Sequence, residues 1–190
     1  MRPQRQPHPS MIRAFGGKTP RIHPSAFVAD DAVVIGDVEI CPEANEWYGC
    51  VLRGDVHFIS IGARTNLQDG TIVHTDRGSN PAIIEEEVSV GHGSILHGCI
   101  VRRGALIGMR AVLLSGCEVE EGAIVGASAV VPEGETVPPG VLVLGVPAKV
   151  RRAVTEQERA RSDRTVRNYL EYLRAMKDDG FGQSLEPFAP

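Results

Sequence analysis

The fold of this chain is decided by residues 101–143, which read VRRGALIGMRAVLLSGCEVEEGAIVGASAVVPEGETVPPGVLV. An α-helix would repeat its apolar residues every 3.6 positions, and a hairpin strand would repeat them every two. Here the aliphatic residues recur every six positions, at Val101, Ile107, Leu113, Val119, Val125, Val131, Val137 and Val143. This period predicts a mainly β fold, a parallel β-helix in which three short strands make one triangular coil and each aliphatic side chain points inward.

The same period runs through the preceding part of the chain in shorter sets. These sets are Ile22, Val28, Val34 and Ile40, then Ile61, Leu67 and Val73, then Ile84, Val90 and Leu96. Small residues such as Gly108 and Ala111 fall between them, where the chain must turn a corner and φ is often positive. Successive coils should stack about 4.8 Å apart through ladder hydrogen bonds. We therefore expect one β-helix domain over residues 11–153.

The C-terminal part of the chain has the pattern of an α-helix. Val154 precedes Thr155-Glu156-Gln157-Glu158, which is a capping box, and no Gly or Pro follows as far as Lys177. The sequence predicts a helix over 154–178 that packs on the outside of the coil. The residues expected to face the coil are Val166, Tyr169, Leu170 and Leu173.

Composition limits the functions that the chain can have. It has 190 residues, 42% of them hydrophobic and 23% charged, and a net charge of −4. No basic stretch is interleaved with aromatic residues, which argues against a nucleic-acid partner. No stretch is long enough to span a membrane, so no membrane partner is expected either.

The two ends and the cysteines suggest where the protein resides. Residues 1–10, MRPQRQPHPS, lack the apolar run of a signal peptide and are expected to be a disordered tail. A transit peptide or a start at Met11 are the alternatives, and 179–190 is expected to be a second tail. Without an export signal, four cysteines outside any CxxC pair predict reduced thiols in a cytoplasmic protein, with Cys50 and Cys117 packed inward.

The six-residue period slips at three places, and a regular coil has no reason to do so. The interval to the next inward residue is nine after Leu52, eleven after Val73 and five after Leu96. The eleven-residue interval contains 75–81, TDRGSNP, which reads as a loop. When each excess is counted as a loop, these three inward residues fall on the same face of successive coils, here called face A.

This count brings two histidines into one column. Arg53, His74 and His97 each follow an inward residue of face A and should stack about 4.8 Å apart. His92 lies on the preceding face, face C, around a corner from His97. Metal–nitrogen bonds are about 2.0–2.1 Å long, so His92 of the same chain cannot easily join the other two on one ion. A shared metal would require His92 from a neighbouring chain, which predicts a homotrimer with three interfacial sites.

Three neutral imidazoles suit Zn²⁺, or alternatively Fe²⁺ or Co²⁺. A structural zinc site would use four protein ligands, whereas three leave one coordination position open for catalysis. Such a metal lowers the pKa of bound water to about 7. The alternative is that His74, His92 and His97 are separate surface or core residues.

Two further groups are candidates for the surroundings of the metal. Gln68 lies on face C near the level of His92, where its amide could hold the metal-bound solvent or a substrate oxygen. It could equally be an exposed polar residue of a strand. Arg53 and Asp55, in the string Arg53-Gly54-Asp55, could form an ion pair across the subunit interface or belong to a solvated loop.

At these residues the sequence resembles the γ-class carbonic anhydrase family of hexapeptide-repeat proteins, over roughly residues 11–178. The matching strings are LRGD at 52–55, NLQD at 66–69 followed by His74, and GH at 91–92 followed by HGC at 97–99. The string GVPAK at 145–149 also matches, but hexapeptide acyltransferases share it. The resemblance implies that the β-helix is left-handed, which the period itself does not determine.

The resemblance also implies an activity, the reversible hydration of CO₂ to bicarbonate, and a role for each matching residue. His74 and His97 of one subunit and His92 of the next would bind Zn²⁺ or Fe²⁺. Gln68 would form a hydrogen bond with metal-bound solvent or bicarbonate, and Arg53 and Asp55 would form an intersubunit ion pair near the substrate. Asn66 would orient the substrate, and Tyr169 would approach the site from the C-terminal helix.

The chain departs from the family at the residues that shuttle protons. Val56 stands where well-characterised members have a glutamate, and only a short loop bearing Asp76 replaces a long acidic loop. Slow turnover is therefore expected. Two other functions remain open for this scaffold: a hexapeptide acyltransferase or acyl-CoA thioesterase, and a metal-binding trimeric scaffold with little activity.

Overall fold

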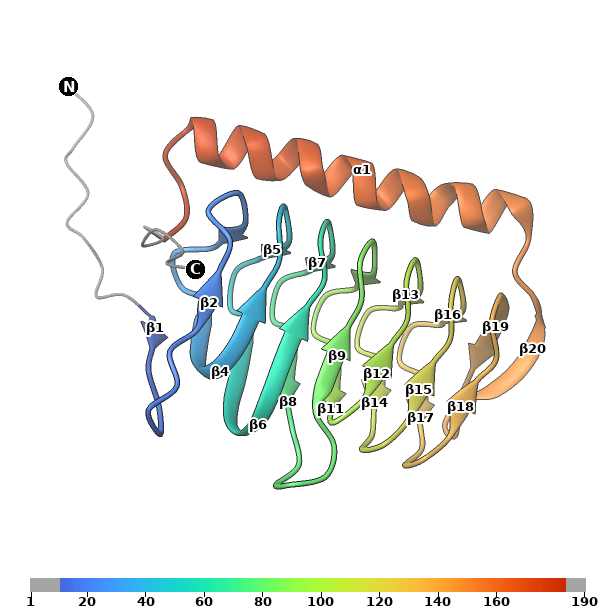
Figure 1. The fold of residues 1–190 in the computed structure, drawn as a ribbon. Coiled ribbons are helices and arrows are strands. Elements are labelled where there is room, and N and C mark those ends of the chain that lie inside the picture. The colour runs from blue at the N-terminus through green and yellow to red at the C-terminus, as the bar shows by residue number, and fades with distance from the viewer. Residues whose placement is uncertain (1–10, 184–190) are drawn as a thin grey trace.

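The computed structural model describes residues 11–183, which form a left-handed parallel β-helix followed by one long α-helix, α1 (Figure 1). The β-helix has three flat faces, named A, B and C in the order in which the chain visits them. This confirms the fold predicted from the six-residue period. The predicted N-terminal tail, 1–10, and the last part of the predicted C-terminal tail, 184–190, lie outside the described residues.

Each face is a ladder of short parallel strands contributed by successive coils. Face A consists of β1 (Ile12–Arg13), the first parts of β4 (Val33–Ile40) and β6 (Val51–Ile61), β8 (Ile72–His74), β11 (Ile95–His97), β14 (Val112–Leu113) and β17 (Val130–Val131). Face B consists of β2 (Arg21–Ile22), the last parts of β4 and β6, β9 (Ala82–Ile84), β12 (Ile100–Val101), β15 (Glu118–Val119) and β18 (Thr136–Val137). Face C consists of β3 (Phe27–Val28), β5 (Asn45–Glu46), β7 (Asn66–Leu67), β10 (Ser89–Val90), β13 (Leu106–Ile107), β16 (Ile124–Val125) and β19 (Val141–Leu144), with β20 (Lys149–Ala153) antiparallel to β19.

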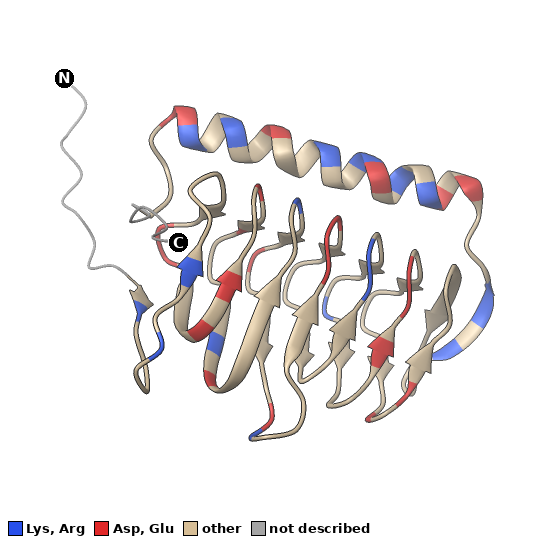
Figure 2. Cartoon of the chain, in the orientation of Figure 1, with Lys and Arg blue, Asp and Glu red and all other residues tan. Residues whose placement is uncertain are grey.

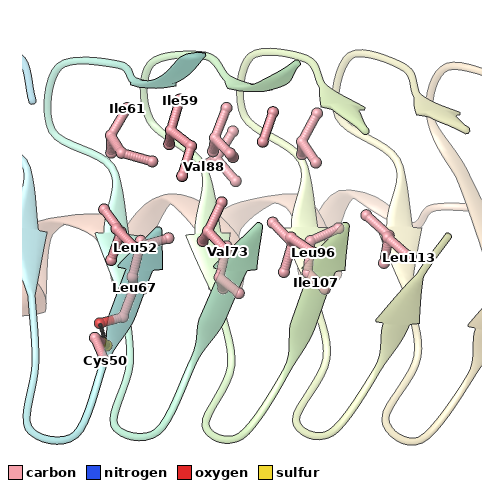
Figure 3. Close-up of a cluster of buried hydrophobic side chains, with 14 of the residues drawn as sticks. Cys50, Leu52, Ile59, Ile61, Leu67, Val73, Val88, Leu96, Ile107 and Leu113 are labelled. Carbon is pink, nitrogen blue, oxygen red and sulfur yellow. Dashed lines mark hydrogen bonds between the residues drawn. The ribbon is translucent and has the colours of Figure 1, made fainter. Parts of the chain in front are cut away.

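The inward side chains of face A stack in the predicted register. Leu52 pairs with Val73, Val73 with Leu96, and Leu96 with Leu113. Figure 3 shows these four side chains in one line along the core, and all four are fully buried. Burying each such aliphatic side chain contributes about 1.5–3 kcal/mol, so the repeated inward position is the main source of the fold's stability.

Glycine turns the corners where the next coil comes too close for a side chain. A Cβ built on Gly108 would lie 2.5 Å from the backbone nitrogen of Ala127 in the following coil. Positive φ is also required at the corners, and here non-glycine residues share the task, since Arg110 and Ser128 both have φ of 57°. The small residues seen in the sequence are thus explained by the close stacking of coils.

The two long intervals have different structures. Residues 75–81 form the predicted loop, which protrudes from the corner between faces A and B (Figure 1). The nine-residue interval after Leu52 is not a loop, because β6 continues from Val51 to Ile61 and passes from face A to face B as one bent strand. Its neighbour β4 makes the same bend with a register shift between Gly36 and Val38.

Helix α1 (Glu156–Asp178) begins two residues later than predicted and lies along the outside of the coils (Figure 1). Thr155 is its N-cap, and both hydrogen bonds of the capping box with Glu158 are present. Leu173 is buried and Tyr169 is half-buried against the coil, as the helical pattern predicts. Within residues 11–183, no helix is both long enough and apolar enough to cross a membrane.

The chain after α1 corrects one expectation. Residues 179–190 were expected to be a tail, but the backbone nitrogen of Gln183 donates to the carbonyl of Val28, and its side-chain Nε2 donates to those of Ala29 and Ala32. Lys177 donates to the carbonyl of Ala26 nearby. The described end of the chain therefore packs against the first coil.

The cysteines agree with the expected packing. Cys41, Cys50, Cys99 and Cys117 are all free thiols, and all but Cys41 are buried. Burial raises the pKa of Cys50 to about 12. Charged residues lie mostly along α1 and in the turns, and many strands between them carry none (Figure 2).

Candidate functional site

His74 and His97 stack on face A, as the register count predicts. They pair directly between β8 and β11, and their ring centroids are 5.1 Å apart. His74 Nδ1 lies 3.1 Å from His97 Nε2. Two nitrogens bound to one tetrahedral ion at 2.0–2.1 Å would be roughly 3.3 Å apart, so this pair fits two adjacent ligand positions of a single metal.

The other ring nitrogen of His74 is held by a carboxylate. His74 Nε2 lies 3.0 Å from Asp55 Oδ1, and Arg53 lies 2.5 Å from the second oxygen, Oδ2. Burial tends to raise the pKa of Asp55, but the hydrogen bonds from Arg53 and His74 outweigh it, and the net shift is downward. A carboxylate in this position orients an imidazole and increases its basicity as a ligand.

His97 has an equivalent support made of different residues. Its Nδ1 lies 2.9 Å from the hydroxyl oxygen of Ser115 in the next coil and 3.7 Å from Asp76. Hydrogen bonds from Asn80 and Ser115 lower the pKa of Asp76. Both histidines therefore have one nitrogen fixed by the protein and one directed at the other ring. We call Arg53, Asp55, His74, Asp76, His97 and Ser115 the first half-site.

His92 belongs to a second group, at the corner between faces C and A. Its Nδ1 lies 2.8 Å from Asp69 Oδ2, and its side chain is 45% exposed. Asp69 lies one coil before His92 at the same position of the corner, because Leu67 pairs with Val90. His92 thus has the same support as His74, a carboxylate on one nitrogen, while much of its ring faces solvent.

A chain of buried amides lies beside His92. Gln68 Nε2 donates to Asn66 Oδ1 at 3.1 Å, and Asn66 Nδ2 donates to Ser89 Oγ at 2.8 Å. Among the residues that the structure describes, none donates a hydrogen bond to the side-chain oxygen of Gln68, so this oxygen can accept one. Gln68 is only 7% exposed and Asn66 is fully buried, so Gln68 is not the exposed polar strand residue that the sequence left open. We call Asn66, Gln68, Asp69, His92 and Tyr169 the second half-site.

Tyr169 reaches this group from α1. Its ring packs edge-on against Trp47 at 5.4 Å. Burial raises its pKa to about 12, and the negative charge of Asp69 contributes to the shift. Tyr169 therefore contributes a neutral phenol to the second half-site.

The structure thus divides the sequence-predicted residues into two groups. Arg53, Asp55, His74 and His97 are together, whereas His92 pairs with Asp69 at another corner. Within residues 11–183, no three His, Cys, Asp or Glu side chains of one chain are arranged to hold a metal ion. Arg53 and Asp55 form their ion pair within the chain, and the intersubunit pair stays a prediction.

Sequence reasoning missed the supporting roles of Asp69 and Ser115. Asp69 could have been found, because it precedes His92 by 23 residues, the same interval that separates His74 from His97. Ser115 had no such signal, since the count places Leu114 rather than Ser115 in the column of His97.

An apolar row runs along the outside of face A next to these histidines. Successive members pair from coil to coil, and Ile72 and Ile95, two residues before His74 and His97, are 41% and 38% exposed. The row consists of Val33, Val51, Ile72, Ile95, Val112 and Val130. A continuous apolar surface of this kind is typical of a protein–protein contact.

Comparison with curated proteins finds close relatives over most of the chain, although no protein-family model matches it. A carbonic anhydrase of Geobacillus kaustophilus is 50% identical over 170 residues, covering 88% of this chain and 93% of the relative. Mitochondrial gamma carbonic anhydrase 3 of Arabidopsis thaliana is 51% identical over 83% of this chain, which spans 63% of that protein. The YrdA protein of Escherichia coli is 41% identical, covering 90% of this chain and 96% of its own.

Solved structures with the same fold carry different names. A Bacillus cereus protein described as a candidate acetyltransferase superposes with a TM-score of 0.86 at 40% identity, covering 88% of this chain and 96% of its own. A hexapeptide transferase family protein of Anaplasma phagocytophilum superposes with a TM-score of 0.83 at 37% identity, covering 86% and 96%. The fold is thus shared by proteins named for two different chemistries.

Proposed function

Because this chain belongs to the γ-class carbonic anhydrase family of hexapeptide-repeat proteins, we propose that it binds a catalytic Zn²⁺ between subunits of a homotrimer and hydrates CO₂ reversibly. Fe²⁺ and Co²⁺ are the alternative metals, since the ligands are imidazoles. The observation that carries the proposal is the approach of His74 Nδ1 to His97 Nε2 at 3.1 Å, with the outer nitrogens held by Asp55 and Ser115.

The third ligand in this proposal is His92 of a second copy of the chain. His92 has a carboxylate on one nitrogen and an exposed ring, which suits a ligand offered to another molecule. The apolar row on face A lies beside His74 and His97, so a second copy that covers it would reach those histidines. Cyclic closure with three copies would give three equivalent sites, each built from one first half-site and one second half-site.

The protein groups would divide the work between binding the metal, holding the substrate and moving protons. A Zn²⁺ held by three imidazoles supplies a water ligand whose pKa falls to about 7. Gln68 Nε2 donates to Asn66, which in turn donates to Ser89, and this chain would orient the amide of Gln68 so that its oxygen accepts from a substrate or solvent O–H. The short loop brings one acidic group close to His97, Asp76, which is hydrogen-bonded to Ser115. The side chain of Val56 cannot transfer protons. Turnover is therefore expected to be slow.

Mixed assemblies test the interfacial site. His92→Ala and His74→Ala should each abolish metal binding while the chain stays folded, as circular dichroism and light scattering would show. Trimers reassembled from equal amounts of the two variants should recover about a quarter of the wild-type metal, because one interface in four combines the intact half-sites. Complete absence of metal in the mixture, with trimers formed, would mean that the three histidines do not share an ion between chains.

Activity is tested separately on metal-loaded protein. CO₂ hydration followed by stopped flow should exceed that of the His92→Ala variant. Metal bound at one ion per chain without any hydration above this control would leave the metal site standing and remove the enzymatic part of the proposal.

A hexapeptide transferase is the second candidate, favoured by the name of the Anaplasma phagocytophilum structure. An acyltransferase would use one histidine as a general base and would not need three on one ion. Protein purified without oxygen and found free of metal, yet active in acetyl transfer from acetyl-CoA, would support this second function.

A further inference from the structure

A cavity of about 370 Å³ lies between helix α1 and face C. Its floor consists mostly of apolar and small residues from three successive coils, with Gln68 from the preceding coil at one end, and its wall is the first half of α1. The residues that line it include Gln68, Ser89, Gly91, Leu106, Met109 and Ile124 on the coil side and Arg161, Ser162 and Thr165 on the helix side. Ligand sites typically have this size and this mixture of an apolar surface with few polar groups.

The charges around this cavity do not cancel. Glu158 also borders it, but its carboxylate is paired with Arg152 at 2.7 Å and accepts hydrogen bonds from Thr155. Within residues 11–183, no ion pair involves the guanidinium of Arg161. The hydroxyls of Ser162 and Thr165 donate to helix carbonyls, and both groups are neutral. The cavity therefore carries one unpaired cation beside an apolar floor.

We propose that this cavity binds a small amphipathic monoanion, a carboxylate with a short aliphatic chain. The carboxylate would pair with Arg161, which can donate two parallel hydrogen bonds to it. The aliphatic chain would lie on Leu106, Met109 and Ile124 and be removed from water.

All the residues that line this cavity belong to one chain, and none of them is a proposed metal ligand. Gln68 lies at one end of the cavity and also belongs to the second half-site, so the two sites are neighbours. The test therefore measures binding of the anion and not hydration of CO₂, which distinguishes failure of this inference from failure of the proposed function.

Isothermal titration of the full-length protein with hexanoate tests the inference. We expect saturable binding of one hexanoate per chain, with or without added Zn²⁺. Arg161→Gln should weaken it about tenfold or more, because a charged hydrogen-bonding partner is lost. Arg164→Gln, on the same helix but outside the cavity lining, is the matched control and should bind as the wild type does.

Two further measurements make the result decisive. Ser162→Leu places a larger side chain in the cavity from a buried position of α1 and should abolish binding. Hexylamine, with the opposite charge and the same chain length, should not bind. Absence of saturable hexanoate binding, equal weakening by Arg161→Gln and Arg164→Gln, or equal binding of hexylamine would each overturn the inference.

Discussion

The coils before residue 95 and those after residue 100 differ in what they bury. Among the described residues, nine of the ten buried polar side chains lie between 45 and 94, and the remaining one, Ser162, is in α1. The nine are Asn45, Glu46, Thr65, Asn66, Gln68, Thr71, Thr75, Ser89 and Ser94. The coils of 101–143 bury only apolar side chains and Cys117. The regular coils thus set the register, and the irregular coils carry the candidate chemistry.

Two of the buried hydroxyl groups in the irregular coils strengthen corners. The hydroxyl of Thr71 donates to the carbonyl of Gln68 at 2.7 Å, and that of Ser94 donates to Gly91 at 2.7 Å. These bonds fix the turns that present Gln68 and His92. Glu46 differs from the other buried polar residues, because neither of its carboxyl oxygens has a hydrogen-bond partner within residues 11–183.

The largest expected effect is on metal affinity. His97→Ala should weaken Zn²⁺ binding by more than about 100-fold, the upper range for loss of an outer-shell partner, because a direct ligand is lost. His23→Ala, outside both half-sites, should leave the affinity unchanged. The measurement is competition with a zinc chelator, and equal affinities for the two variants would contradict the assignment of His97 as a ligand.

The sequence alone predicts which residues of successive coils are paired, but it does not predict which side chains contact one another. Counting residues places His74 beside His97 because every coil advances the chain by the same height. The same count cannot show that Arg53 turns to Asp55 within its own chain, since side-chain rotamers depend on neighbours from other coils. It also cannot show that Phe181–Gln183 return to the first coil, because that contact joins distant parts of the sequence and follows no repeat.

Glu46 gives the second largest expected effect, on stability. It occupies an inward position of face C, between Val28 and Leu67, where other coils have aliphatic residues. Burial raises its pKa well above the ordinary value, so the folded chain keeps a proton that the unfolded chain releases near pH 4. Stability is then greatest below that pH and falls by about 1.4 kcal/mol per pH unit until the folded pKa is reached.

Glu46→Leu should therefore raise the free energy of unfolding at pH 7.5 by about 2–4 kcal/mol and flatten its dependence on pH. Urea unfolding between pH 5 and pH 9 measures both. Val125→Glu places the same acid at an inward position of face C in a regular coil and should destabilise the protein as pH rises. Parallel pH profiles for wild type and Glu46→Leu would show that the buried acid is not what distinguishes the irregular coils.

Substitution of Ser115 should have a smaller effect on zinc affinity. Ser115 belongs to the regular coils but contacts His97 from the next coil, so this substitution tests whether the regular coils contribute to the site. Ser115→Ala removes the hydroxyl 2.9 Å from His97 Nδ1 and should lower zinc affinity about 10–100-fold without unfolding the coil. Thr136→Ala, an exposed strand residue of the regular coils, is the matched control. An affinity unchanged by Ser115→Ala would confine the metal's surroundings to the irregular coils alone.

The smallest expected effect concerns α1, which begins beside the regular coils and ends over the irregular ones. Thr155→Ala removes the capping hydroxyl that accepts from the backbone nitrogen of Glu158 and should cost about 1 kcal/mol of stability, measured by urea unfolding. Fraying at this end should leave zinc affinity within twofold of wild type, because Tyr169 packs on Trp47 several turns further along. A tenfold loss of zinc affinity would instead mean that α1 acts as one rigid element. The end of α1 beside the regular coils would then influence the position of Tyr169 at the site.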